Sequence, residues 1–396
     1  MTTMRIAIVG AGLNGLAVAL LLRRAGFDCT LFERGAVPRD AGTGIYLWPQ
    51  GVRVLRGLLP AAALHRYGHP IDFLDTHDRS GRVINRQHVR IADADATVPA
   101  MMFLRADLHR MLGAALGRDA IRFDAPCERV DEIDGQAVLT FESGARQRFD
   151  LVIGTDGLHS VVRRHVCPHN RPVCVGLAAS RGIVRFDSPR FSADRCQIFM
   201  ADYARVVTYC VNEAESVRYW FAAYQVDDGP LLDRNGLLDR FRTLPDAVRE
   251  MIAATADTAI NTQRLHTLSG AGPWHRGGAV LLGDSIHAML PTLGYGFTLG
   301  LENGFLLAQA LAGARAAGTH AALMLYERQV AARSQALIEV MNDMTRAYYF
   351  NAPDTVTAER IGRIAERFNA LTCSPVALHE DAMAAPPGVH PLTGDE

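Results

Sequence analysis

A glycine-rich stretch near the start of this 396-residue chain has the residue types and spacing needed to hold phosphate groups. Gly10, Gly12 and Gly15 match the pattern G-x-G-x-x-G, and the acidic residue Glu33 follows further along the chain. Glycines at these positions allow a tight turn and let the backbone approach a pyrophosphate, while the acid can accept hydrogen bonds from ribose hydroxyls. The pattern therefore predicts a dinucleotide that contains ADP, without separating NAD from FAD.

The elements around this pattern fit the same chemistry. Residues 5–9 predict a buried parallel strand, residues 14–25 predict an apolar helix that Gly26 ends, and residues 28–32 predict a second strand. The N-terminus of such a helix offers free N–H groups to phosphates. No second fingerprint of this kind occurs, so one dinucleotide has a Rossmann unit of its own. The predicted contact residues here are Gly10, Gly12, Leu13, Asn14, Gly15, Glu33 and Arg34.

Two further apolar runs end in an aspartate beside a glycine. Residues 150–164 (DLVIGTDGLHSVVRR) contain Asp156, and the run before Gly283 continues as GDSIHAMLPTLGYGFTLGLENG. A helical pattern over residues 102–116 carries Arg105. Taken singly, an aspartate of this kind fits a helix N-cap, and Arg105 fits a surface ion pair. The combination predicts one binding site built from distant segments.

Over roughly residues 4–345 the chain resembles the single-component flavoprotein aromatic hydroxylases, the para-hydroxybenzoate hydroxylase-like family. GAGLNG is similar to the FAD fingerprint of that family, GTDGLHSVVR to its D-G motif, and LLGDSIHAMLPTLGYGFTLGLEN to its G-D motif. Two departures stand out. Asn303 occupies a position that is usually Asp, and Phe297-Thr298 replace a small residue or Met followed by Asn.

The resemblance implies an α/β fold in three parts. A discontinuous, Rossmann-like FAD-binding domain would take residues 1–70, 98–174 and 273–320, and a mixed β-sheet substrate domain would take 71–97 and 175–272. The alternating runs RGIVRF, CQIFMA, RVVTYCV and SVRYWFAAYQV favour antiparallel strands in the second of these domains. A C-terminal helical layer over 321–349 and a flexible tail over 380–396 complete the prediction.

The resemblance also implies roles for the cofactor residues. Asp284 would bond a ribityl hydroxyl of FAD, and a helix over about 297–312 would point its N-terminus at the N1–C2=O edge of the flavin. Arg105 would reach the diphosphate, Val130 the adenine, and Asp156 both FAD and transiently bound NAD(P)H. The full set that the resemblance implies is Arg105, Val130, Asp156, Gly283, Asp284, Pro291, Gly294, Gly296, Phe297 and Thr298.

Residues of the predicted substrate strands are candidates for the substrate pocket. Arg205 would bind a substrate anion or oxygen, although a strand-edge surface position also fits it. Tyr209, Tyr219 and Tyr224 lie on the same strands. Tyr46 and Trp48 would lie near the flavin or serve in packing. His287 has the chemistry of a base, but in the family its position is usually structural. The strongest pocket candidates are Arg205, Tyr209 and Tyr46.

The implied reaction is that of a monooxygenase. NADH or NADPH binds transiently and reduces non-covalently bound FAD, O2 forms a flavin C4a-hydroperoxide, and one oxygen atom enters a small aromatic or heteroaromatic substrate. Two alternatives stay open, a flavin-dependent oxidase or dehydrogenase without oxygen insertion and a non-catalytic FAD-binding protein. A flavin-dependent halogenase is disfavoured, because the chain has neither the W-x-W-x-I-P signature nor any lysine.

Composition sets the remaining bounds. A net charge of -1 gives no reason to expect nucleic acid, and no apolar run is long enough for stable membrane insertion. The seven cysteines are scattered and form no C-x-x-C pair, which is typical of a reduced, cytoplasmic protein. No metal is expected. The partners would be the substrate, O2 and NAD(P)H, and either a monomer or a homodimer is compatible with the sequence.

Overall fold

The N-terminal strand lies inside a six-stranded sheet of the order β19-β20-β13-β1-β2-β9. The computed structural model describes residues 4–36, 43–92, 97–351 and 358–373, so the predicted tail over 380–396 lies outside the described residues. All four residues of β1 are buried, as expected of a strand with parallel neighbours on both sides. The strands are β1 (Ile6–Val9), β2 (Cys29–Phe32), β9 (Ile121–Arg122), β13 (Leu151–Gly154), β19 (His275–Arg276) and β20 (Ala279–Leu281).

Helices cover this sheet and place the fingerprint at its edge. Helix α1 (Leu13–Arg24) packs against α4 (Arg105–Leu116) and α9 (Gly296–Gly313). Gly26 ends α1 with a φ of 79°, as the sequence predicts. Helix α4 begins at Arg105 and not at residue 102, because residues up to Leu104 continue a strand. Shorter helices of this region are α2 (Pro49–Arg56), α3 (Ala61–Tyr67), α5 (Val161–Val166) and α8 (Asp284–His287).

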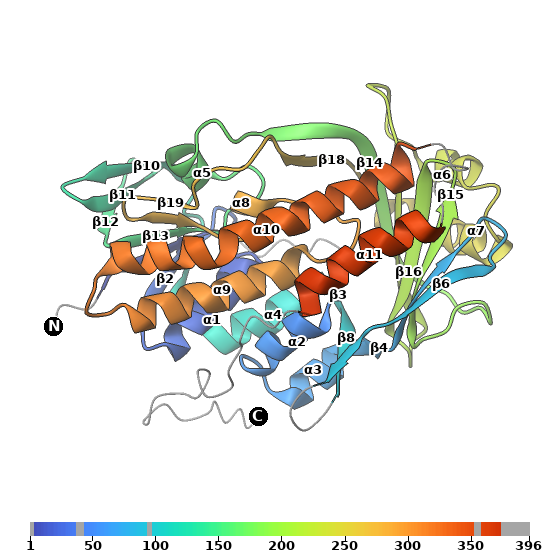
Figure 1. The fold of residues 1–396 in the computed structure, drawn as a ribbon, viewed down its shortest axis with the longest axis horizontal. Helices are drawn as coiled ribbons and strands as arrows, with labels where there is room; N and C mark the ends of the chain where they lie inside the picture. The colour runs from blue at the N-terminus through green and yellow to red at the C-terminus, as the bar shows by residue number, and fades with distance from the viewer. Residues whose placement is uncertain (1–3, 37–42, 93–96, 352–357, 374–396) are drawn as a thin grey trace.

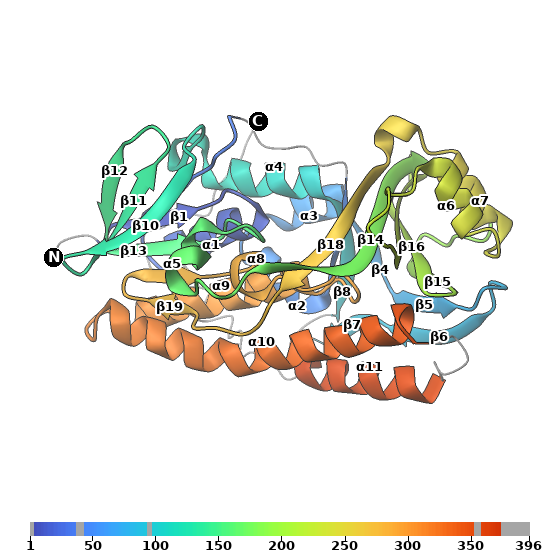
Figure 2. The same cartoon turned by 90° about the horizontal axis from the view of Figure 1, so that it is seen from above.

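A seven-stranded sheet forms the other half of the molecule (Figure 2). Its order is β18-β14-β17-β16-β15-β5-β6, and every pair is antiparallel except β15 with β5, so it is the mixed sheet that the sequence predicts. The strands are β5 (Phe73–His77), β6 (Val83–His88), β14 (Pro172–Arg185), β15 (Arg195–Ala201), β16 (Ala204–Asn212), β17 (Val217–Gln225) and β18 (Asn261–Leu268).

Alternation along these strands separates two apolar layers. Tyr209, Tyr219 and Phe221 face the cluster that reaches the C-terminal helices, whereas Trp220 and Tyr224 face a cluster under two short helices. Those helices, α6 (Arg234–Arg240) and α7 (Asp246–Ala253), lie at the far end of the molecule in Figure 2. The sheet therefore turns one face toward the FAD-fingerprint half and the other toward α6 and α7.

Two small sheets and two long helices complete the fold. One small sheet contains β10 (Cys127–Ile133), β11 (Gln136–Phe141) and β12 (Arg146–Phe149), and the other contains β3 (Gly44–Leu47), β4 (Gly68–Ile71), β7 (Arg90–Ala92) and β8 (Thr97–Leu104). Helix α10 (Thr319–Tyr349) runs along α9, and α11 (Ala358–Cys373) lies beside the second half of α10 (Figure 1). The sequence-based layer over 321–349 corresponds to α10, but it missed α11. Among the described residues, no helix is both long and apolar enough to span a membrane.

Candidate active site

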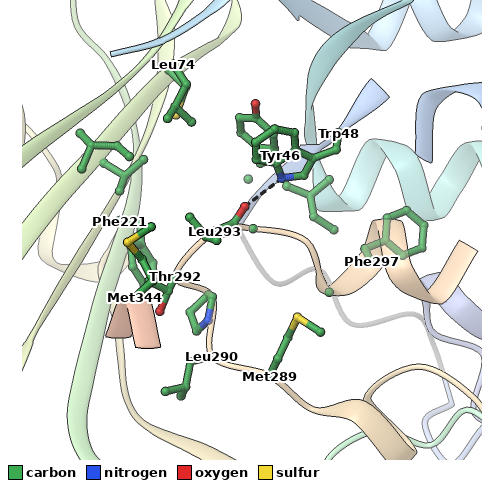
Figure 3. Close-up of a pocket in the computed structure, with 18 of the residues that line it drawn as sticks. Tyr46, Trp48, Leu74, Phe221, Met289, Leu290, Thr292, Leu293, Phe297 and Met344 are labelled. Carbon is green, nitrogen blue, oxygen red and sulfur yellow. Dashed lines mark hydrogen bonds between the residues drawn. The ribbon is translucent and has the colours of Figure 1, made fainter. Parts of the chain in front are cut away.

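A cavity of about 360 Å³ lies between the two halves and brings together residues of the fingerprint, of the D-G and G-D motifs and of three of the four predicted substrate strands, with Arg105. It is bordered by the fingerprint, by β3, by the inner face of the seven-stranded sheet, by the loop over 289–294 and by α11. Figure 3 shows Tyr46 and Trp48 on one side and Phe221 and Met344 on another, with the indole Nε1 of Trp48 donating to the Leu293 carbonyl at 2.8 Å. The cavity is thus mostly apolar and has few polar groups, as is typical of a small-molecule site.

The fingerprint glycines divide into two kinds. A Cβ on Gly10 would lie 2.8 Å from the Thr155 carbonyl oxygen, and one on Gly15 would lie 2.0 Å from that of Gly10. These two glycines therefore permit close packing of the chain on itself. A Cβ on Gly12, in contrast, would meet no protein atom within 4 Å. Gly12 borders the cavity, so the space in front of it is where a pyrophosphate can approach the backbone.

Asn14 fits into a notch between two glycines that are far away in sequence. A Cβ on Gly283 would lie 2.3 Å from Asn14 Nδ2, and one on Gly300 would lie 2.1 Å from Asn14 Oδ1. These contacts explain why glycine stands at both positions. The Oδ1 atom of Asn14 is buried and has no hydrogen-bond partner among the described residues, although Asn14 borders the cavity. An acceptor left in this condition fits a cofactor that brings donor groups.

Glu33 holds the fingerprint loop from the end of β2. Its carboxylate accepts hydrogen bonds from the N–H groups of Ala11 and Gly35, each at 3.0 Å. Leu13 borders the cavity, whereas the neighbouring Arg34 is exposed. Bonds from Glu33 to ribose and contacts of Arg34 with the cofactor stay predictions.

Arg105 and Asp284 border the cavity with opposite charges, and neither side chain has an ion-pair partner in direct contact among the described residues. Their charges act on each other without a direct bond between them among the described contacts. Exclusion of bulk water raises the pKa of Asp284, and the charge of Arg105 opposes that rise. The same exclusion lowers the pKa of Arg105. Such a pair fits a ligand that carries both phosphate oxygens and hydroxyl groups, as FAD does.

Asp156 binds the first N–H groups of α5, although the N-cap residue itself is Ser160, whose hydroxyl accepts the N–H of Arg163. One carboxylate oxygen accepts the N–H groups of Val161 and Val162 at 2.6 and 3.3 Å, at the start of α5. The other oxygen, Oδ1, is buried and has no partner among the described residues. Burial also raises the pKa of Asp156. Val130 is buried in β10 and does not border the cavity, so its adenine contact stays a prediction, as does the second role of Asp156.

Arg163 is a positioning residue that sequence reasoning missed. Its buried guanidinium donates to the carbonyl oxygens of Leu158, Asn170 and Ser285, the last at 2.8 Å. Leu158 belongs to the D-G motif and Ser285 to the G-D motif, so one side chain joins the two. His109 on α4 likewise positions the fingerprint, because its Nε2 atom lies 2.8 Å from the Ala11 carbonyl oxygen. The basic turn after Asp156 was the only signal for Arg163.

The loop from Pro291 to α9 borders the cavity with little side-chain bulk. Pro291, Gly294, Gly296 and Phe297 all line it, and α9 begins at Gly296, one residue before the predicted start. Gly294 has a φ of 65°, a left-handed conformation that favours glycine. Helix α9 therefore directs its N-terminus toward the cavity, as predicted.

Thr298 is placed differently from the prediction. It does not line the cavity, because its buried hydroxyl oxygen accepts the backbone N–H of Trp48 at 3.2 Å. A contact between its side chain and the flavin edge is therefore not what the structure supports. Asn303 is buried, and its amide nitrogen donates to the Ser334 hydroxyl on α10 at 3.4 Å, so its side chain helps to pack α9 against α10.

The substrate candidates Arg205, Tyr209 and Tyr46 all border the cavity. The guanidinium of Arg205 is only 1% exposed, which rules out the surface alternative. One of its nitrogens donates to the Thr292 carbonyl at 2.6 Å, and the group stacks on the ring of Tyr348. Its Nε and the second terminal nitrogen are buried and form no hydrogen bond of ordinary geometry with a described residue, although the guanidinium opposes the rise that burial causes in the pKa of Tyr349.

The tyrosines of the cavity stay protonated at neutral pH, because burial raises the pKa of Tyr46 and of Tyr209 well above 10. The hydroxyl of Tyr46 is buried without a partner among the described residues. Tyr219 also borders the cavity, but Tyr224 does not and bonds Ser180 on the opposite face. Tyr219 and Tyr224 are five residues apart on one strand, and an odd spacing places them on opposite faces.

His287 lies away from the cavity and contributes to acid sensitivity. Burial lowers its pKa to about 4, and neither ring nitrogen has a hydrogen-bond partner among the described residues. The unfolded histidine gains its proton near pH 6.5, so stability is full above that pH and is lost as the pH falls toward 4. We expect a loss of about 3 kcal/mol over this window.

The free energy of unfolding of His287→Leu should fall less than that of the parent as the pH decreases from 6.5 toward 4. The exposed control His65→Gln should show the same decrease as the parent. Urea unfolding of each protein between pH 4.5 and 7.5 measures the difference. An unchanged pH dependence in His287→Leu would mean that His287 is not the group responsible. Retained turnover in this variant would also separate His287 from any role as a base.

The variant Asp284→Ala should retain less FAD while the fold survives, because this carboxylate bonds no described protein group. Loss of one charge-assisted hydrogen bond corresponds to roughly 1.5–3 kcal/mol, or about 10- to 100-fold in affinity. Fluorescence titration of the apoprotein with FAD measures the change, and Asp119→Ala, an exposed aspartate, serves as control. An FAD affinity equal to that of the parent would remove Asp284 from the site.

Comparison with known proteins agrees with this geometry. The sequence profile of the FAD binding domain family matches residues 3–341. A 3-amino-4-hydroxybenzoate 2-monooxygenase of Streptomyces cremeus is 35% identical over 303 residues, 76% of each chain. A 6-hydroxynicotinate 3-monooxygenase of Pseudomonas fluorescens is 28% identical over 86% of this chain and 91% of its own.

A solved structure of similar fold is Klebsiella pneumoniae HpxO in complex with FAD and uric acid. Its TM-score is 0.83, at 23% identity over 94% of this chain and 97% of that one. The residues bordering the cavity fit FAD, since an open backbone at Gly12, an unpartnered acceptor at Asn14 and unpaired charges at Arg105 and Asp284 all await a ligand. This chain belongs to the FAD binding domain family and is an FAD-dependent aromatic monooxygenase of the para-hydroxybenzoate hydroxylase-like type.

Proposed function

We propose that this enzyme uses NADH or NADPH to hydroxylate a small aromatic or heteroaromatic ring that carries an anionic substituent. The observation that carries the proposal is Arg205, a guanidinium that is almost fully buried and has two nitrogens without partners at the cavity. A buried charge without an ion pair costs free energy in the empty protein. A substrate carboxylate or ring oxyanion would supply a missing partner by accepting a charge-assisted hydrogen bond from one of these nitrogens.

The remaining lining supports an aromatic ring of modest size. Tyr209, Tyr219 and Phe221 form an aromatic side of the cavity on the sheet. The Tyr46 hydroxyl stays protonated at neutral pH and is free to donate a hydrogen bond to an oxygen or nitrogen of the ring. The relatives named above act on a hydroxylated aminobenzoate and on a hydroxynicotinate, both small rings with a carboxylate.

The groups around the cavity have separate roles in the proposed reaction. The fingerprint, Arg105 and Asp284 would hold FAD, which would supply the redox chemistry and the oxygen activation. Arg205 fixes the substrate by its anion, the aromatic residues orient the ring, and the apolar loop over 289–293 excludes water. The described cysteines form no disulfide, which supports work in a reducing compartment such as the cytoplasm. Either a monomer or a homodimer is compatible with this arrangement.

The test combines reduction and labelling. Purified holoenzyme is mixed with NADH or NADPH and a panel of hydroxy- and amino-substituted benzoates and nicotinates, first without oxygen to follow flavin reduction and then under 18O2 to follow the product. We expect one member of the panel to accelerate anaerobic flavin reduction and to yield a product with one 18O atom. Product without label, together with stoichiometric hydrogen peroxide, would favour the oxidase alternative. Absence of reduction by either nucleotide would favour a non-catalytic FAD-binding protein.

A further inference from the structure

One face of the C-terminal helix α11 borders the cavity. Ile361, Ala365 and Phe368 all line it, and their spacing of four and three residues places them on one side of the helix. Ala365 is the small residue of the three and stands between the two larger ones. The helix thus leaves space at Ala365 that a longer side chain would take.

Helix α11 is held at this position by contacts of two kinds. The ring of Phe368 packs between those of Trp48 and Tyr295, with centroids 5.0 and 5.3 Å away. Two carbonyl oxygens of the last helical turn accept side-chain bonds, that of Leu371 from Arg333 Nε at 3.0 Å and that of Thr372 from Gln50 Nε2 at 2.9 Å. These carbonyls have no partner within the helix, so the bonds satisfy its C-terminal end.

Arg333 joins this anchor to the loop that borders the cavity. Its guanidinium pairs with the buried carboxylate of Glu302 at 3.0 Å and lies 3.3 Å from the hydroxyl of Tyr295. Tyr295 stands between the cavity-lining glycines 294 and 296. The position of α11 and that of the loop are therefore set by the same side chain.

The seven-stranded sheet meets α11 around the same cavity. Thr76, Asn85 and Gln87 of β5 and β6 border it, and the amide of Gln87 donates to the amide oxygen of Asn369 on α11 at 3.1 Å. A polar pair therefore links the edge of the sheet to the helix beside the cavity. The wall formed by α11 is continuous with the sheet that carries Arg205.

We infer that α11 is the wall that limits the size of the substrate, with Ala365 as the residue that determines specificity. This inference rests on the proposed function, since it concerns the aromatic ligand of the same cavity. A ring system held by its anion at Arg205 meets α11 as it grows. A larger residue at position 365 therefore weakens the binding of two-ring ligands more than the binding of one-ring ligands.

The test compares Ala365→Leu with Ala370→Leu. Leucine is nearly as good a helix former as alanine, and Ala370 is exposed on the same helix, so both variants carry the same change of composition. The probes are 4-hydroxybenzoate and 6-hydroxy-2-naphthoate, which differ by one ring. Their dissociation constants come from the perturbation of flavin absorbance in oxidised holoenzyme, without turnover. In Ala365→Leu we expect the ratio of the naphthoate constant to the benzoate constant to rise at least tenfold, and in Ala370→Leu to change less than twofold.

Equal effects of Ala365→Leu on both probes, or none, would overturn the inference. If the parent binds only 4-hydroxybenzoate, the inference requires that Ala365→Gly also bind 6-hydroxy-2-naphthoate. If the parent binds neither acid, the proposed function loses its support. The role of α11 is then tested separately with the fluorescent anion 8-anilinonaphthalene-1-sulfonate. The inference then requires that the emission of this probe be lower with Ala365→Leu than with the parent protein and be retained with Ala370→Leu. A parent protein that gives no emission would overturn the inference about α11 as well.

Discussion

Replacing Arg205 with methionine should lower kcat/KM for the aromatic substrate by about 100- to 1000-fold while FAD stays bound. The guanidinium lines the cavity with two buried nitrogens that no described protein group accepts from. Removing one partner of a buried, hydrogen-bonded charge pair costs roughly 3–4 kcal/mol, which gives the expected factor. The variant keeps the length and apolar stem of the side chain, so its packing on Tyr348 is largely retained.

Three measurements separate binding from folding in this experiment. Steady-state kinetics should show most of the loss in KM, because the anion is bound in the ground state as well. Arg205→Lys should recover part of the activity, since it keeps the charge but not the paired N–H geometry. Arg185→Met removes an exposed arginine of the same sheet and should have no effect. A fully active Arg205→Met, or one that unfolds and loses FAD, would argue for a structural role.

The variant Gly12→Val should give a folded but colourless protein. The backbone at Gly12 has φ -72° and ψ -177°, which valine adopts without strain, and a Cβ there meets no protein atom within 4 Å. The added side chain would fill the space in front of the α1 N-terminus, where the pyrophosphate must approach. We expect the affinity for FAD to fall by about 100-fold or more, because both close contact and phosphate bonds are lost.

Gly15→Ala is the contrasting variant. Its Cβ would lie 2.0 Å from the Gly10 carbonyl oxygen, so the fingerprint itself must distort. Thermal unfolding without added FAD should therefore show a lower Tm for Gly15→Ala and a Tm near that of the parent apoprotein for Gly12→Val. If Gly12→Val also unfolds, the space in front of Gly12 serves packing and not the cofactor.

Local signals in the sequence were sufficient for the central elements of the fold. A strand, a glycine turn and an acid at a fixed distance depend on residues close together in the chain, so β1, α1 and β2 follow from a short stretch. The alternating runs also predicted the antiparallel strands of the substrate domain. The odd spacing between Tyr219 and Tyr224 on one strand likewise requires that their side chains lie on opposite faces of the sheet.

Other features depended on contacts that no local pattern reports. Arg163 joins two motifs that lie 122 residues apart, and Gln50 reaches a carbonyl 322 residues away. Helix α11 did have a helical apolar repeat, with Ile361, Ile364 and Phe368 facing inward. That repeat lay beyond the motifs that carried the family resemblance, so nothing linked it to the site. Its place beside the cavity depends on how α10 and α11 pack together.

The order of strands in the six-stranded sheet has a consequence for synthesis of the chain. Its neighbouring strands β1, β13 and β20 begin at residues 6, 151 and 279, so a ribosome makes them far apart in time. At about 5–20 residues per second, the first strand waits on the order of ten seconds to a minute for the last. Most of the seven-stranded sheet is synthesised within that interval. We expect the nascent chain to form that sheet first and to close the cofactor half around it, so FAD is captured late, when α9 has left the ribosome.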